Sequence, residues 1–234
     1  MTQSKPQPYP LRTYPLSLKQ MTEEELAVVF AMTSRRPEPF DEIAQIVTAE
    51  KAEKFHERWV LGYGHASVAE HAVLHMAVEN LSRLSADALE DNRLSSYTEK
   101  SSRYQMFSRD YYHVPSELDD SIELKDMFTG ICDKLFETYE ELISGVSEFL
   151  KSERARRENE TDRTYEARLR REAIDSCRFI LPAATLTNIG MTINARSLEH
   201  AISKLLSSAT NEERELGNAL KEKGREITPT LIKY

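Results

Sequence analysis

The sequence is poor in cysteine and has no excess of basic residues. Its 234 residues include only two cysteines, Cys132 and Cys177, and they form no CxxC pattern. A disulfide framework and a cysteine-ligated metal site are therefore not expected, and a reducing compartment, the cytoplasm, is expected. The 31 lysines and arginines are outnumbered by 39 aspartates and glutamates. A general DNA- or RNA-binding protein normally carries a basic surface, so we expect no nucleic-acid partner, although a local cluster of arginines could still bind a phosphate.

Long apolar runs are also lacking. No segment is apolar over the length that spans a bilayer, and the N-terminal residues lack the apolar stretch of a signal peptide, so we expect no membrane partner. The hydrophobic content of 40% is still ample for the core of one domain. Residues 1–20 are rich in proline and are predicted to form an extended arm. The domain itself is expected over residues 21–234.

The pattern of apolar residues predicts a helix-rich α+β domain with a small, mostly antiparallel sheet. Thr22 and Glu25 form a capping box that should open a helix ending near Ser34. Further helices are expected over residues 41–61, 82–90, 117–153 and 197–223, with Gly224 as the last stop. Residues 105–115 are predicted to be a strand, and residues 73–78 are compatible with a short one. The charged residues 151–171 are expected to form an exposed excursion between two helices.

A polar segment over residues 91–104 stands out from this pattern. It contains two arginines, four serines and a glutamate, and Leu94 is its only aliphatic residue. Such a segment buries little, so packing does not explain its composition. Its arginines supply bidentate donors and its serines supply short hydroxyl donors, which suits a loop that grips an anionic ligand. A solvated linker between two elements is the alternative.

Three separated stretches resemble the flavin-dependent thymidylate synthases (ThyX). Glu99-Lys-Ser-Ser-Arg-Tyr matches the second half of that family's signature, Arg-His-Arg-x-x-Ser-x-Asn-Glu-x-Ser-x-Arg-Tyr. His65-x-Ser-x-x-Glu-His resembles an upstream motif of the family. Asn194-Ala-Arg-Ser-Leu-x-His resembles a third motif, which is preceded at the expected distance by Arg178-x-x-Leu-Pro. Three motifs in the family's order are far more specific than one.

The resemblance implies a ThyX-like fold and a homotetramer whose active sites lie between subunits. FAD would take hydride from NADPH, and dUMP would be methylated to dTMP with carbon from methylenetetrahydrofolate. The positions that match flavin contacts are Ser34, His65, Ser67, Arg93, Glu99, Asn194, Arg196 and His200. The positions that match the nucleotide site are Glu99, Ser101, Ser102, Arg103 and Arg178. Of these, Ser101, Arg103 and Arg178 would take the catalytic roles, because arginines can form charge-assisted forks to phosphate and polarise a pyrimidine.

The first half of the signature is not kept. Asp91 and Asn92 stand where the family has Arg-His, and Leu205 stands where it has a late arginine. Lys204 is adjacent to Leu205 but should point elsewhere on a helix. These losses weigh more against activation of dUMP than against folding. Two alternatives therefore remain: a diverged flavoprotein for another pyrimidine nucleotide, with Asp91 accepting a hydrogen bond from a cytosine-like amino group, and a catalytically silent paralogue that binds flavin or nucleotide.

Several candidate residues also have plain structural interpretations. His65, His71 and His75 lack the spacing of a zinc motif, so no metal is assigned. His71 and His200 could be packed or surface histidines, and Arg196 could pair with an acidic neighbour on its own helix. Ser101 has no adjacent base and is not expected to be a nucleophile. Trp59 is assigned to the core.

Overall fold

The computed structural model describes residues 12–16 and 18–233, and the chain divides into two compact units, residues 1–72 and residues 73–234. Most of the predicted arm, residues 1–11 and residue 17, lies outside the described residues. Residues 12–16 contain neither helix nor strand, and Arg12 and Tyr14 both contact Asp41, at 2.5 Å and 3.1 Å. The single domain expected over residues 21–234 stays a prediction.

The first unit consists of short helical segments. Helix α1 (Glu23–Thr33) begins with the predicted capping box, and Ser34, near which its end was predicted, is its C-cap. The predicted continuous helix over residues 41–61 is wrong, because α2 (Phe40–Ile46) and α3 (Ala49–Phe55) are separate. Val47 is extended between them. Thr48 is the N-cap of α3, because its hydroxyl accepts a hydrogen bond from the backbone N–H of Lys51. A π-helical segment (His56–Gly62) and a 3₁₀ segment (Ala66–His71) complete the unit.

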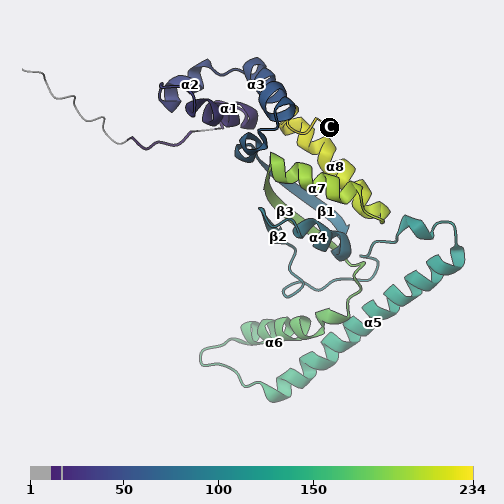
Figure 1. Cartoon of the computed structure of the whole chain (residues 1–234). Coiled ribbons are helices and arrows are strands. Elements are labelled where there is room, and N and C mark those ends of the chain that lie inside the picture. Colours follow the sequence, from purple (N-terminus) through teal and green to yellow (C-terminus); the bar gives the residue numbers. More distant parts are fainter. Residues whose placement is uncertain (1–11, 17, 234) are drawn as a thin grey trace, which may run out of the picture. The chain divides into compact units, whose positions relative to one another are not determined.

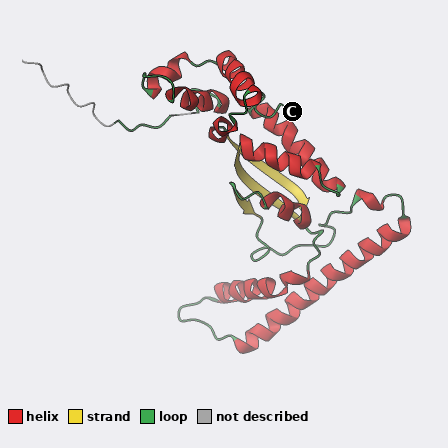
Figure 2. Cartoon of the chain, in the orientation of Figure 1, coloured by secondary structure: helices red, strands yellow, loops and turns green. Residues whose placement is uncertain are grey.

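The second unit contains a three-stranded antiparallel sheet (Figures 1 and 2). Its strands are β1 (Val73–Ser82), β2 (Ser95–Glu99) and β3 (Leu186–Asn194), in the order β1-β3-β2. Residues 73–78 are confirmed as a strand, but β2 falls inside the polar segment, and the central strand β3 was not predicted. Asn80, with φ of 59°, lies where the register of β1 slips against β3, the geometry of a bulge. The α+β class with a small antiparallel sheet is confirmed.

The strand predicted over residues 105–115 is wrong. In the described chain this segment makes only an isolated bridge between Tyr112 and Thr185. Its aromatic residues pack against a helix rather than alternating across a sheet: Phe107 is buried, and the Tyr112 ring stacks on Phe136 at a centroid distance of 6.0 Å. The aromatic residues of this segment therefore indicate burial against a helix, and they were wrongly taken as the sign of a strand.

Helices α4 (Arg83–Glu90), α7 (Ala195–Leu206) and α8 (Asn211–Ile227) accompany the sheet, and Figure 1 shows α7 and α8 next to each other along it. The helix predicted over residues 82–90 is confirmed. The single helix predicted over residues 197–223 is wrong, because residues 207–210 separate α7 from α8. Gly224 is no stop: it lies within α8, where an added Cβ would come 3.0 Å from Leu198. The glycine thus permits close packing of the two helices.

The long helix α5 (Ile122–Glu153) and α6 (Asp162–Cys177) lie side by side in Figure 1. Their shared core contains Phe136, Tyr139, Ile143, Leu169, Ala173 and Ile174. The charged excursion expected over residues 151–171 is a shorter connection, residues 154–161, because both helices extend into it. Leu124, Met127 and Ile131 of α5 remain 52%, 58% and 55% exposed. No helix of the described residues has the length and apolarity needed to cross a membrane.

Candidate functional site

The loop after β2 carries the residues that match the nucleotide site. β2 pairs with β3 as far as Glu99, and the backbone N–H of Lys100 donates to the carbonyl of Asn188 at 2.8 Å. The chain then turns: the backbone N–H of Arg103 donates to the Ser101 hydroxyl at 3.3 Å. Ser101 therefore shapes the loop through its own hydroxyl, as serine commonly does in turns. It is half-buried.

Arg103 and Arg178 converge on one carboxylate, that of Asp175 on α6. Arg103 forms a fork, with Nε to Oδ1 at 3.1 Å and an Nη to Oδ2 at 3.0 Å. Arg178 Nε approaches the same Oδ1 at 3.0 Å, and its other donor group reaches the Ser102 hydroxyl at 3.3 Å. The hydrogen bonds from Arg103 lower the pKa of Asp175 below its ordinary value. Two guanidinium groups facing one carboxylate leave one excess positive charge in this cluster.

Sequence reasoning missed Asp175, although a signal existed. Asp175 lies three residues before Arg178 on one helical run, a spacing at which opposite charges meet. The three side chains are partly open to solvent: Arg103 is 57% exposed, Arg178 41% and Asp175 35%. An anion from solution can therefore reach the donor edges of both arginines.

Glu99 makes an ion pair that the sequence did not predict. Its carboxylate lies 3.0 Å and 3.3 Å from the guanidinium nitrogens of Arg83, at the start of α4, and both side chains are largely buried. Glu90 lies close to this ion pair. Burial raises the pKa of Glu90, and the negative charge of Glu99 raises it further. Arg83 is thus the cation that holds Glu99 in place at the end of β2.

The residues that match the third motif lie at the opposite end of β3. The side chain of Asn194 accepts a hydrogen bond from the backbone of Ser197 at 2.8 Å and caps α7. Arg196 and His200 are exposed on that helix. Asn188, which pairs with the loop of Arg103, is about 20 Å along the strand from Asn194. One chain therefore does not bring Arg103 and Arg178 together with Asn194 and Arg196.

At the positions that depart from the family signature, the side chains form contacts within this chain or are buried in it. Lys204 contacts the carboxylate of Asp91 and also donates to the carbonyl of Ala88 at 3.3 Å. Asn92 is buried and donates to the carbonyl of Leu89 at 2.7 Å. Leu205 is fully buried. Arg93, the one retained arginine of this half, is exposed.

In the first unit, three predicted flavin contacts line one cavity of about 320 Å³. These are Ser34, His65 and Ser67. Trp59, assigned to the core from sequence, is instead half-buried in the wall of this cavity. The exposed His71 also lines it, with its ring 4.9 Å from that of Phe30. Arg35 also lines the cavity, and its guanidinium carbon lies 4.7 Å from the centre of the Trp59 ring. Neither Arg35 nor Trp59 was predicted as a site residue.

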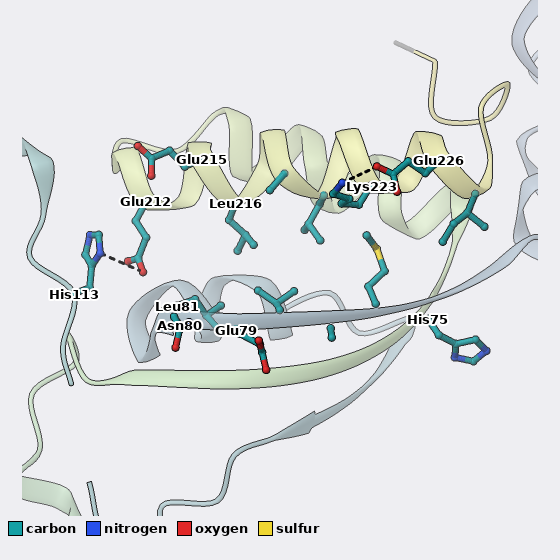
Figure 3. A pocket seen from close by; sticks show the side chains of 16 residues that line it. His75, Glu79, Asn80, Leu81, His113, Glu212, Glu215, Leu216, Lys223 and Glu226 are labelled. Atoms are coloured by element: carbon teal, nitrogen blue, oxygen red, sulfur yellow. Dashed lines mark hydrogen bonds and ion pairs between the residues drawn. The ribbon is translucent and has the colours of Figure 1, made fainter. Parts of the chain in front are cut away.

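A larger cavity of about 600 Å³ lies between β1 and α8 (Figure 3). None of the predicted site residues lines it. Several of its polar groups are bonded within the chain: Lys223 pairs with Glu226 at 2.6 Å, and His113 lies 3.8 Å from Glu212. Glu212 also accepts hydrogen bonds from the backbone N–H and hydroxyl of Ser82 and from the hydroxyl of Ser85, at 2.5–2.7 Å. These bonds tie the start of α8 to the start of α4.

The chain is similar in sequence to known proteins over most of its length. The family model described as thymidylate synthase complementing protein matches residues 17–230. A UPF0159 protein of Chlamydia pneumoniae is 35% identical over 190 residues, which cover 78% of this chain and 35% of the relative. A flavin-dependent thymidylate synthase of Clostridium tetani is 27% identical over 212 residues, which cover 90% of this chain and 81% of the relative. One of Pyrococcus abyssi is 30% identical over 186 residues, 77% of this chain and 67% of the relative.

The relatives differ in length. The matched residues span about a third of the UPF0159 proteins of Chlamydia pneumoniae and Chlamydia muridarum, 35% and 36%. The relatives whose names state an activity are matched over a larger share of their length.

Proposed function

This chain belongs to the thymidylate synthase complementing protein family, and on that premise we propose that it is a flavin-dependent enzyme of the thymidylate synthase type. It binds FAD and a pyrimidine nucleotide. The specific reaction is the reductive methylation of dUMP to dTMP, with methylenetetrahydrofolate and NADPH as co-substrates. The observation that carries the proposal is the convergence of Arg103 and Arg178 on one carboxylate beside Ser102.

The arginine cluster has the chemistry of a phosphate site. Each guanidinium is planar, always charged and able to donate two parallel hydrogen bonds to phosphate oxygens. Asp175 occupies only part of the donors of each arginine, so the rest can face a nucleotide. The loop residues Ser101 and Ser102 would position the same ligand, and Arg178 would stabilise negative charge on its pyrimidine ring.

The cavity of the first unit fits part of a flavin nucleotide. It combines hydroxyls, aromatic rings, the carboxylate of Glu70 and the guanidinium of Arg35. We assign flavin contacts to Ser34, His65 and Ser67 there, and to Arg93, Glu99, Asn194, Arg196 and His200 in the second unit. Bound FAD would supply the hydride that carbon transfer from the folate leaves the product lacking. The protein's own part is to hold the two ligands in register.

Assembly into a homotetramer would complete the site. The loop of Arg103 pairs with Asn188 near one end of β3 and Asn194 lies at the other end, so two copies could together supply both residues to one compact site. The exposed apolar side chains of α5 offer a surface for such contacts, and Ile131 among them also lines an apolar cavity of about 450 Å³. Apolar exposure of this extent is typical of interfaces.

A second candidate function has one specific observation in its favour. The family's arginine position at 91 holds a carboxylate that is already paired with Lys204, and the late arginine position holds the buried Leu205. A diverged flavoprotein for another pyrimidine nucleotide, or a catalytically silent paralogue, would not need those cations.

Three measurements separate these functions. Purified protein that is yellow, or that takes up FAD, supports the flavoprotein proposal, and protein that cannot be loaded with FAD contradicts it. Oxidation of NADPH that requires both dUMP and methylenetetrahydrofolate supports the synthase reaction. Rescue of a thymidine-requiring bacterium supports it in the cell. Flavin binding without either activity would instead favour the second candidate.

A further inference from the structure

The loop that carries Arg103 contacts helix α6 at a second point. Arg103 itself bonds to Asp175. The next residue of the loop, Tyr104, lies beside Arg171, whose guanidinium carbon is 5.7 Å from the centre of the tyrosine ring. Arg171 lies four residues before Asp175, and residues at this spacing share one face of a helix. A ring attracts a cation at this distance, so Tyr104 holds Arg171 near the nucleotide site, although both side chains are exposed.

Arg170 contacts the same loop. One of its terminal nitrogens lies 3.8 Å from the sulfur of Met106, which is a weak acceptor. Most of the donors of Arg170 therefore stay available to a ligand, and its side chain is exposed. Together with the pair already described, these residues form an extended arginine cluster, which consists of Arg103, Arg170, Arg171 and Arg178.

Few carboxylates offset this cluster. Asp175 is shared by two of its arginines. On the same helix, Glu172 pairs with Arg154 at 2.8 Å, and Glu166 is exposed and lies outside ion-pair distance of the cluster. In the part of the chain that the structure describes, the other two arginines have no carboxylate within ion-pair distance. Four guanidinium groups and one carboxylate leave an excess of three positive charges, in a chain whose net charge is −8. A local excess of this kind suits a ligand with several negative charges.

The spacing of the arginines indicates an elongated anion. Arg171 lies about 6 Å along the helix from Asp175, the residue on which Arg103 and Arg178 converge. A nucleoside monophosphate has one phosphate group, for which the fork donors of Arg103 and Arg178 suffice. A second phosphate group extends the anion, and the guanidinium groups of Arg171 and Arg170 can donate to its oxygens.

We propose that the nucleotide site extends onto α6 and takes a pyrimidine nucleotide with at least two phosphate groups, whose terminal phosphate binds Arg171 and Arg170. The inference rests on the proposed nucleotide-binding function and deepens it by naming the substrate class. In this arrangement dUMP fills only part of the extended site, which favours the candidate function on another pyrimidine nucleotide.

Equilibrium titration of the full-length protein with dUMP, dUDP and dUTP tests the proposal. EDTA is present throughout, because divalent cations would neutralise the phosphates. We expect dUDP to bind about tenfold more tightly than dUMP, the gain expected for one charge-assisted contact. Arg171→Gln should remove this gain and leave the affinity for dUMP within twofold. Arg171→Lys, which keeps the charge without the planar fork, should recover part of the gain.

Arg163 offers a matched control. It is an exposed arginine of the same helix, eight residues and about 12 Å before Arg171. Arg163→Gln removes the same charge and should leave the affinities for dUMP and dUDP unchanged within twofold. Arg103→Gln should weaken the binding of all three nucleotides, because it removes the contact to the first phosphate. Thermal melting of each variant separates a loss of binding from a loss of fold.

Each result supports or contradicts a particular statement. Equal affinities for dUMP and dUDP would overturn the extended site and leave the proposed function standing. Equal losses in Arg171→Gln and Arg163→Gln would assign the gain to general charge attraction and overturn it too. If Arg171→Gln weakened the binding of a polyglutamylated folate but not of dUDP, the second anion would be the folate tail, and the proposal would be wrong. Protein that binds none of the three nucleotides would contradict both the extended site and the proposed function.

Discussion

Lys204 of α7 forms an ion pair with Asp91, the C-cap residue that follows α4, and the same ammonium group donates to the carbonyl of Ala88. Lys204 lies four residues after His200 and eight after Arg196, so the three share one face of α7. Two of these three positions match flavin contacts. Asp91 thus places a negative charge at the end of a row of cationic or ionisable side chains. The ion pair with Asp91 engages the ammonium group of Lys204.

The first prediction concerns this pair. Asp91→Ala should leave Lys204 without its partner and raise the positive potential along the face of α7, so FAD affinity should rise severalfold at low salt and less at high salt. Lys204→Met should lower it. Equilibrium titration with FAD at two ionic strengths measures both. Unchanged affinity in both variants would mean that this face of α7 does not contact the cofactor.

The second prediction concerns Asp175. Asp175→Asn removes the charge that holds Arg103 and Arg178 together, and the two cations then repel each other. The dissociation constant for dUMP should rise about tenfold, while FAD binding should stay unchanged. Asp175→Glu should restore part of the affinity. Tighter dUMP binding in Asp175→Asn would show instead that the carboxylate competes with the phosphate.

The third prediction concerns Glu212, whose side chain is only 15% exposed. Glu212→Ala leaves the backbone N–H of Ser82 and two hydroxyls without their acceptor and should cost about 2–4 kcal/mol of unfolding free energy. Denaturant unfolding measures this. Glu215, which lines the same cavity but is exposed, is the matched control, and Glu215→Ala should change stability by no more than about 0.5 kcal/mol. Equal effects would contradict the role assigned to Glu212.

The fourth prediction concerns His56, which is fully buried and whose Nε2 lies 3.0 Å from the carbonyl of Glu24. Burial lowers its pKa below the ordinary value of 6.5, although the contact with Glu24 opposes the shift. The folded state therefore prefers neutral histidine, and its contribution to stability is full above pH 6.5 and is lost as the pH falls below that value. The melting temperature should drop between pH 7.5 and pH 5.5. His56→Phe should be less sensitive to pH over this range.

The fifth prediction concerns the connection between α5 and α6. Hydrogen bonds from Arg168 at 2.9 Å lower the pKa of Glu160 to about 2. Since the folded pKa lies below the ordinary value of 4.5, this pair stabilises the connection above pH 4.5 and ceases to do so as the pH falls towards 2. The protection of the amides of residues 154–161, measured as the exchange rate relative to the intrinsic rate at each pH, should be higher at pH 7 than near pH 3. Arg168→Met should show fast exchange at both values once intrinsic rates are corrected.

Local signals in the sequence were sufficient for several elements. The capping box of Thr22 and Glu25, the helix over residues 82–90 and the strand beginning at Val73 follow from hydrogen bonds and side-chain patterns that span a few residues. The helix predicted over residues 41–61 was wrong because Thr48, a second helix start, was overlooked inside an otherwise helical pattern. The central strand β3 was missed because its pairing on both sides is made by residues distant in sequence.

The sequence by itself determined the family, the helix-rich α+β class and the identity of the arginines able to bind an anion, because these depend on residue type and order. Only the tertiary structure decided which groups meet. Asp175 joins Arg103 to Arg178, Lys204 is taken by Asp91, and Arg35 lies on Trp59. The physical reason is that ion pairs and ring contacts depend on distances in space, and the side chains in these contacts lie between 3 and 113 positions apart along the chain.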